Sequence, residues 1–203
     1  MGKILILNGS PRAPKSNSKQ YADIFAQKCK WDTKYSCITS SNHLNLCSEL
    51  NHFSDVLLVF PLYADGIPVT LLNFLKNLEN HLPDRKPVIS VLINCGFLED
   101  FQNDTAVKMI KFFCQKTQCP FGSVLKIGSG EAILTTPFKI LAIRKIKQLA
   151  NSITSQKYKI FHVTMPISPG LFVKASTKYW TEYGKRNGIT PEQMQTMKIE
   201  ENE

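Results

Sequence analysis

The sequence predicts an α/β protein built on a mostly parallel sheet with helices on both faces. Short apolar runs alternate along the chain with segments whose apolar residues recur every three or four positions. Two of these runs, residues 54–61 and 86–94, are apolar almost throughout, as expected for strands that are buried on both faces. The connections are short, which favours right-handed β-α-β crossovers and a single sheet.

The chain opens with a strand, a loop of unusual composition and a helix. Lys3–Leu7 is an apolar run, residues 8–18 are rich in Gly, Ser and Asn, and a helical pattern runs from around Lys19 to Cys29. Such a loop at a helix start offers free backbone N–H groups, hydroxyl donors and the positive end of a helix dipole. These features suit a phosphate monoester.

A simpler interpretation of the same loop also exists. Ser16, Asn17 or Ser18 could only cap the helix, and Gly9 could only turn the chain. Neither a Walker A motif nor the GxGxxG pattern is present to decide the question.

Four further strands and four further helices follow in alternation. We expect strands at 34–38, 54–61, 86–94 and 124–128, and helices near 71–81, 103–116, 138–152 and 171–187. Residues 158–165 are consistent with either a further strand or an extended run across the surface. The last helix carries several aromatic residues, which could dock a second subunit; packing in the core is the interpretation that we favour.

Composition bounds the class of protein. A chain of 203 residues is long enough for one well-buried domain and short for two, and 43% hydrophobic with 20% charged residues is ordinary for a soluble globular protein. We therefore expect a single domain over 1–203, with a helical extension from about 166 and a disordered acidic tail. No apolar run approaches the roughly 18 residues of a membrane span, and no signal-peptide pattern is present, so we expect a cytoplasmic protein with no membrane partner.

The cysteine spacing and the net charge limit which metal ions and binding partners we expect. The six cysteines form no CxxC pair, so we expect no metal site. The formal net charge is +9, and residues 101–203 hold 15 Lys/Arg against 7 Asp/Glu. This excess could attract a phosphorylated cofactor, an acidic partner or an anionic surface, or could be only a solvated face. No zinc-finger pattern or aromatic-studded basic ladder accompanies it, so we expect no nucleic-acid partner.

Three loops fall at the carboxyl ends of the predicted strands, where doubly wound sheets bind ligands. They are residues 8–18, 61–68 and 94–99. The middle loop combines two prolines, a glycine and Tyr63, so it is stiff and offers backbone N–H groups beside a ring, which suits a flat heteroaromatic. Alternatively, Tyr63 packs over the sheet and Asp65 caps the next helix. In the third loop, Gly96 permits either close approach of a ligand or a tight turn.

The motifs KILILNGSPR with SNS, PLYADGIP and NCGF resemble those of the flavodoxin-like NAD(P)H-dependent FMN reductase and quinone reductase superfamily. The resemblance runs from Met1 to about Gly188. It implies a flavodoxin-like doubly wound five-stranded parallel sheet of order 2-1-3-4-5, with FMN at the ends of the first and third strands. It also implies a homodimeric enzyme that takes electrons from NAD(P)H and passes them to a small-molecule acceptor such as a flavin or quinone.

The resemblance further assigns the cofactor-binding residues. The FMN phosphate would be held by Ser10, Arg12, Ser16, Asn17 and Ser18. The isoalloxazine would lie along Pro61, Leu62, Tyr63, Ala64, Asp65 and Gly66, and its other side would be closed by Asn94, Cys95, Gly96 and Phe97. No catalytic side chain is assigned, because hydride passes directly between nicotinamide and flavin.

Two departures from the superfamily point towards a reductase. Iron–sulfur members carry a compact cysteine cluster after the second strand, whereas this chain has only Cys37 and Cys47 there. Flavodoxins are acidic carriers, whereas this chain is basic. A non-enzymatic electron carrier of the flavodoxin type, and a flavodoxin-like binding module without cofactor, remain the alternative functions.

Overall fold

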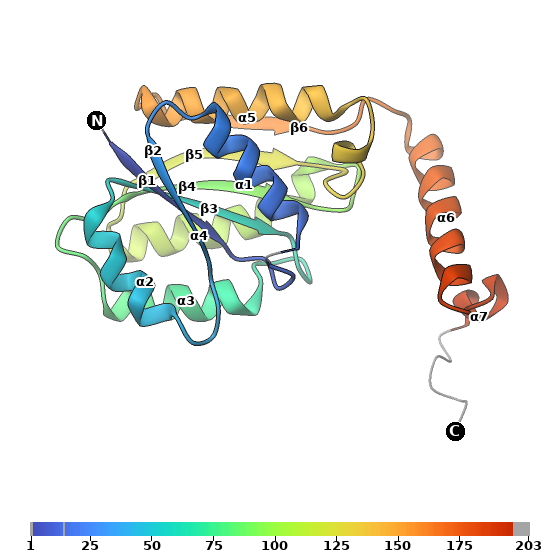
Figure 1. Ribbon diagram of the computed structural model, residues 1–203, viewed down its shortest axis with the longest axis horizontal. Helices are drawn as coiled ribbons and strands as arrows, with labels where there is room; N and C mark the ends of the chain where they lie inside the picture. Colours follow the sequence, from blue (N-terminus) through green and yellow to red (C-terminus); the bar gives the residue numbers. More distant parts are fainter. Residues whose placement is uncertain (1, 14, 197–203) are drawn as a thin grey trace. The chain divides into compact units, whose positions relative to one another are not determined.

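A six-stranded sheet in which all neighbouring strands run parallel forms the centre of the fold (Figure 1). The computed structural model describes residues 2–13 and 15–196. The sheet belongs to the first of two units into which the chain divides, Met1–Met165 and Pro166–Glu203. The strands are β1 (Lys3–Asn8), β2 (Asp32–Cys37), β3 (Asp55–Pro61), β4 (Val88–Asn94), β5 (Phe121–Ile127) and β6 (Ile160–Val163).

The strand order is β2-β1-β3-β4-β5-β6, which confirms the doubly wound arrangement and corrects the predicted number of strands from five to six. The sixth strand lies in the segment that the sequence left ambiguous. It pairs only with β5, in a register that places His162 beside Lys126. Because β6 is at the edge of the sheet, it is only partly buried and lacks the continuous apolar run of β3 or β4.

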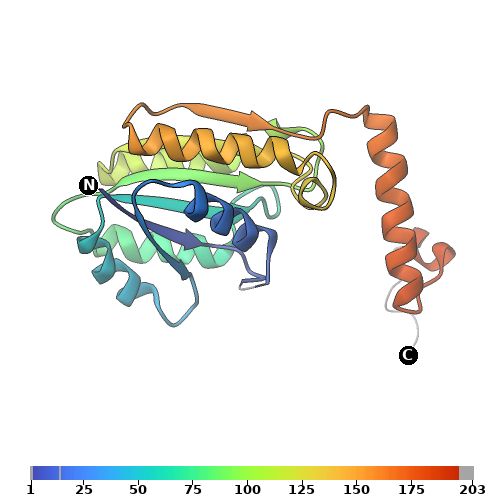
Figure 2. The same ribbon diagram turned by 45° about the horizontal axis from the view of Figure 1, so that its top comes forward.

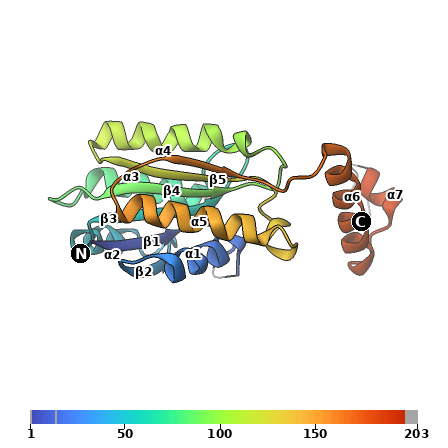
Figure 3. The ribbon, with the colours of Figure 1, turned by 90° about the horizontal axis from the view of Figure 1, so that it is seen from above.

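Helices cover both faces of the sheet, with α1 and α5 on one face and α3 and α4 on the other (Figure 3). Alternate residues of β1 supply the two cores: Leu5 and Leu7 pack with α2, α3 and α4, while Ile4 and Ile6 point to the opposite face. The helices of this unit are α1 (Asn17–Lys28), α2 (His43–Glu49), α3 (Val69–Asn80), α4 (Asp104–Thr117) and α5 (Lys139–Thr154), with short 3₁₀ turns at Leu50–His52, Asp100–Asn103 and Ile133–Thr135.

The sequence analysis did not predict two short helices. Helix α2 has seven residues and is held by the burial of Leu46 and Cys47, too few apolar positions to show a helical period. The other, α7 (Pro191–Gln195), carries a capping box in which Thr190 and Gln193 bond each other's backbone N–H groups. That pair is a sequence signal that could have found the helix.

In its described residues, the second unit holds the helices α6 (Pro169–Arg186) and α7, drawn in red in Figure 2. Ser168 caps α6, and the rings of Tyr179, Trp180 and Tyr183 contact one another with centroids 5.2–6.4 Å apart. Within this unit the buried residue of α6 is Gly184, which lies against Met194 of α7. The sequence analysis favoured packing of this helix in the core, and that stays a prediction.

Among the residues that the structure describes, no helix combines the length and the apolar character needed to cross a membrane.

Asp55 is a buried acid at the amino end of β3, far along the strand from the loops that follow it. Its side chain is 3% exposed, and Oδ2 accepts a 2.7 Å hydrogen bond from Ser54 Oγ. Among the described residues, Oδ1 has no hydrogen-bond partner. Burial raises the pKa of this carboxyl group, an effect that Ser54 and Arg85 only partly oppose.

We predict that Asp55→Asn stabilises the protein at pH 7. Because the folded state holds the Asp55 proton more tightly than the unfolded state, ionisation of this group costs stability as pH rises through its raised pKa. The variant removes that cost, and its advantage should vanish below about pH 4, where the carboxyl is protonated in both states. Urea unfolding at several pH values measures this; an advantage independent of pH would contradict the assignment.

Candidate functional site

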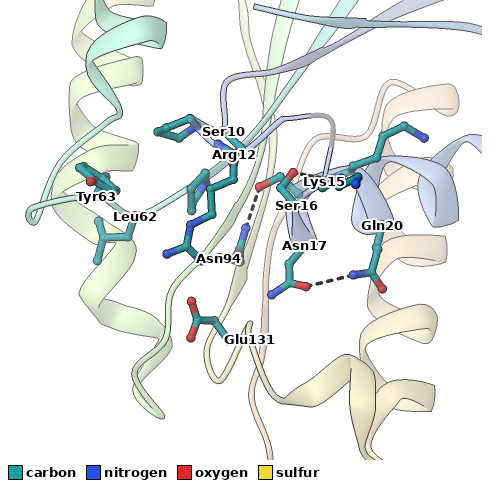
Figure 4. A pocket seen from close by; sticks show the side chains of 14 residues that line it. Ser10, Arg12, Lys15, Ser16, Asn17, Gln20, Leu62, Tyr63, Asn94 and Glu131 are labelled. Atoms are coloured by element: carbon teal, nitrogen blue, oxygen red, sulfur yellow. Dashed lines mark hydrogen bonds between the residues drawn. The ribbon is translucent and has the colours of Figure 1, made fainter. Parts of the chain in front are cut away.

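A cavity of about 560 Å³ opens at the carboxyl ends of β1, β3 and β4 (Figure 4). Its walls come from the loop after β1, the start of α1, the end of β3, Asn94 at the end of β4, and Glu131 after β5. The residues that line it are Ser10, Pro11, Arg12, Lys15, Ser16, Asn17, Ser18, Lys19, Gln20, Pro61, Leu62, Tyr63, Asn94 and Glu131. All five residues predicted to hold a phosphate are among them.

The amino end of α1 forms one wall. Ser16 is the N-cap: its backbone is extended and its Oγ accepts a 3.2 Å hydrogen bond from Lys19 N. The next N–H groups of the first turn, those of Asn17 and Ser18, have no preceding carbonyl within the helix to bond. The first turn contains no acidic residue. The helix therefore presents its positive end to the cavity, and no acidic side chain of its own first turn balances it.

Asn8, the last residue of β1, fixes the loop that carries Ser10. It is fully buried; its Oδ1 accepts a 2.9 Å hydrogen bond from Ser10 N, and its Nδ2 donates to Tyr35 OH at 2.9 Å and more weakly to Ser16 Oγ at 3.4 Å. One amide thus joins the loop, the edge strand β2 and the cap of α1. The sequence analysis gave Asn8 no role, although an amide closing an apolar strand was a visible signal.

Charged side chains surround this end of the cavity. Arg12 and Lys15 are exposed, and Lys19 is partly buried against its own helix. Figure 4 shows the guanidinium of Arg12 and the carboxylate of Glu131 both directed into the cavity from opposite walls. The sequence analysis did not predict Lys15, Lys19 or Glu131 as site residues. The two lysines belong to no motif, and Glu131 follows a different strand.

The loop after β3 places one aromatic ring at the cavity. Tyr63 is 59% exposed and lines the wall beside Pro61 and Leu62. Tyr63 and Gly66 exchange two backbone hydrogen bonds of 3.0 Å across a tight turn. The two central residues of this turn, Ala64 and Asp65, have φ values of 45° and 57°, a left-handed conformation that non-glycine residues seldom adopt.

This loop does not offer backbone donors in the way that its composition suggested. Leu62 N donates to Asn94 O at 2.7 Å, and the N–H groups of Tyr63 and Gly66 are used within the turn. Ala64, Asp65 and Gly66 are absent from the cavity wall. A flat ligand would therefore meet the ring of Tyr63 and the Pro61–Leu62 segment rather than a row of free N–H groups.

Asn94 is the only residue of the predicted Asn94–Phe97 group that lines the cavity. It is 3% exposed, and its Nδ2 donates to Ser18 Oγ at 3.3 Å and to Phe60 O at 3.2 Å, so it ties β4 to α1 and β3. Cys95 is buried, and Asn103 Nδ2 lies 3.4 Å from its Sγ. Burial raises the pKa of this thiol. Gly96 and the half-exposed Phe97 also lie outside the wall.

The loop after β5 forms the wall of the cavity that carries Glu131. Gly130 N donates to Cys95 O at 2.7 Å, and the hydroxyl of the buried Tyr21, on α1, donates to Gly130 O at 2.7 Å. These two bonds hold the neighbouring Glu131 at the cavity. A Cβ at position 130 would lie 2.7 Å from Asn94 Cβ and 3.1 Å from Cys95 O, so the close approach requires glycine.

The residues of this cavity fit a phosphorylated ligand that carries a flat ring. Hydroxyl and backbone donors, a helix amino end and the cations Arg12 and Lys15 gather at one end, which is the donor set that a phosphate requires. The exposed ring of Tyr63 lies on another wall. The volume falls within the range of about 300–1,000 Å³ typical of cofactor and small-molecule sites.

No family model matches this chain, and no curated protein matches its sequence. Solved structures do match its fold. A flavodoxin from Streptococcus pneumoniae TIGR4 has a TM-score of 0.55 at 17% identity, over 76% of this chain and 99% of its own. An NAD(P)H:quinone oxidoreductase from Methanothermobacter marburgensis has a TM-score of 0.61 at 9% identity, over 75% and 96%. An FMN-dependent NADH-azoreductase from Bacillus anthracis, solved with FMN, has a TM-score of 0.55 at 13% identity, over 75% and 99%.

These matches show that the first unit has the flavodoxin-like fold. The neighbours include quinone reductases, azoreductases and flavodoxins, which fit the superfamily that the sequence motifs resemble.

We predict that Gly130→Ala destabilises the protein by about 1–3 kcal/mol, because the added methyl group overlaps Asn94 and a backbone carbonyl. Gly96→Ala is the matched control: a Cβ there meets nothing within 4 Å, so the change in free energy of unfolding should stay within about 0.5 kcal/mol. Chemical denaturation of both variants measures the difference. Equal stabilities would show that the loop after β5 is not held against Asn94.

Proposed function

We propose that this chain is a flavin-dependent oxidoreductase that binds FMN in the cavity, takes electrons from NAD(P)H and passes them to a small acceptor such as a flavin or quinone. One observation carries the proposal. The amino end of α1, with no acid in its first turn, faces a cavity that is lined by the cations Arg12, Lys15 and Lys19 and by one acid, Glu131. Of the three cations, Lys19 is paired with Asp23. Concentrated positive charge of this kind favours a bound anion, and the dianionic phosphate of FMN satisfies it.

The structural neighbours support the choice of cofactor and reaction. They include an FMN-dependent NADH-azoreductase solved with FMN, an NADPH-quinone reductase and flavodoxins. The motif resemblance over residues 8–18 and 61–68 points to the same cofactor and to the same two ends of the cavity.

The roles of the residues follow from their positions. Ser10, Arg12, Ser16, Asn17 and Ser18 would hold the phosphate, with Asn8 fixing the loop between them. Tyr63, Pro61 and Leu62 would orient the ring system, and Asn94 keeps β3 and β4 in place beneath it.

The chemistry requires little else of the protein. Bound FMN supplies the hydride-accepting ring, so no side chain is needed as an acid, base or nucleophile. The protein's contribution is to hold cofactor and substrates in position and to tune the electrostatics around them. The exposed face of Tyr63 leaves one side of the cavity open to a second planar molecule.

The direct test starts from purified protein. We expect a yellow protein, or a colourless one that acquires flavin absorbance and quenches flavin fluorescence when FMN is added. Anaerobic NADH or NADPH should then bleach the bound flavin at a rate fast enough for turnover. Binding without bleaching would identify an electron carrier instead, and failure to take up FMN would identify a binding module and refute the proposal.

We predict that Arg12→Ala weakens FMN binding by about tenfold, because it removes a charge-assisted contact to the phosphate. Riboflavin, which lacks the phosphate, should bind the variant and the wild type equally. Lys147→Ala is the matched control, since Lys147 is an exposed cation on α5 outside the cavity. Fluorescence titration measures all affinities; equal losses for FMN and riboflavin would place the phosphate elsewhere.

A further inference from the structure

We propose that the ammonium of Lys19 leaves Asp23 and binds the phosphate when a phosphorylated flavin occupies the cavity. Asp23 then competes with the phosphate for Lys19 and so sets how tightly the cavity binds this ligand. This inference rests on the proposed function and concerns the same site. It is carried by the position of Lys19 in the first turn of α1, by its contacts, and by the charges around it.

Lys19 lines the cavity, and hydrogen bonds restrain both its backbone and the end of its side chain. Its backbone N–H donates to the cap Ser16, and the residue lines the cavity beside Asn17 and Ser18. Its ammonium donates to both carboxylate oxygens of Asp23 at 2.6 Å. The same Nζ lies 4.8 Å from the centroid of the Tyr35 ring.

The location of this cation is unfavourable unless an anion is present. A lysine in the first turn faces the positive end of the helix dipole, where acidic residues are preferred. Asp23, four residues later, compensates only in part, because a basic residue that precedes its acidic partner in a helix is the weaker orientation of the pair. A phosphate at the amino end of α1 would balance both the helix and the ammonium.

The pair with Asp23 is also easy to exchange. The side chains of Lys19 and Asp23 are 32% and 47% exposed, so water and salt screen their attraction. Asp23 can stay hydrated at the surface when its partner leaves. The long and flexible stem of lysine allows the ammonium to move while the backbone of α1 stays fixed.

Tyr35 supplies a fixed platform for Lys19 next to the cradle. Its hydroxyl accepts the 2.9 Å hydrogen bond from Asn8 and lies 3.2 Å from Cys37 Sγ. Burial, and then the bond to Cys37, raise the pKa of this phenol, so it stays neutral and hydrogen-bonded at physiological pH. Because Asn8 also holds Ser10 N, the ring beneath the ammonium is tied directly to the loop that would bind the phosphate.

Asp23→Asn tests the inference. Removing the competing carboxylate should free Lys19 and tighten FMN binding by about two- to fivefold, the range that corresponds to one exposed ion pair. Riboflavin binding should not change. Glu79→Gln is the matched control: it removes an acid from another exposed pair, with Lys116, and changes the net charge equally, but Glu79 lies outside the cavity.

A double-mutant cycle separates exchange from a general charge effect. In the background of Lys19→Met, which keeps the apolar stem, FMN binding should weaken and Asp23→Asn should have no further effect. The inference would be overturned if Asp23→Asn still tightened FMN binding in this background, or if it also tightened riboflavin binding. It would equally be overturned if Glu79→Gln tightened FMN binding, or if Asp23→Asn alone weakened it. If the wild type binds riboflavin as tightly as FMN, the cavity has no phosphate site. That result would refute the proposed function as well as the role of Lys19.

Discussion

The candidate site depends on one buried amide. Asn8 ends β1 at the point where the sheet stops and the loop begins, and its side chain satisfies partners on the loop, on β2 and on the cap of α1. An amide is suited to this role because it donates and accepts at once, without the desolvation cost of a buried charge. Three segments separated in sequence are thereby held at one place, and the positive end of α1 acquires a defined direction.

The parts of the fold that could be predicted from sequence are those in which local pattern and burial agree. The continuous runs of β3 and β4 and the period of α3 reflect burial that depends little on the rest of the chain. The segment of β6 stayed ambiguous between a strand and an extended run because an edge position removes the apolar signal, and α2 was not predicted because seven residues cannot show a period. In both cases tertiary contacts, rather than local preference, decide the structure.

The candidate site was predictable to a similar extent. The phosphate end comes from one short stretch of sequence, and its predicted residues Ser10, Arg12 and 16–18 all line the cavity. The ring end is not contiguous: Cys95, Gly96 and Phe97 follow Asn94 in the chain but do not line the cavity. Glu131 lines it from a loop that no motif marks. Sequence also could not show that the N–H groups of Leu62 and Tyr63 are already used, because hydrogen-bond partners are set by the turn and by β4.

The turn at Ala64 and Asp65 gives the ring wall an energetic character of its own. Each left-handed non-glycine residue costs about 1–2 kcal/mol, and two reciprocal hydrogen bonds between Tyr63 and Gly66 keep the turn closed against that cost. The ring wall thus combines an uncommon backbone conformation with the hydrogen bonds that hold it closed. A molecule that packed on Tyr63 more tightly in this closed turn than in an open one would stabilise the closed backbone of residues 63–66, and the closed turn would in return tighten its binding.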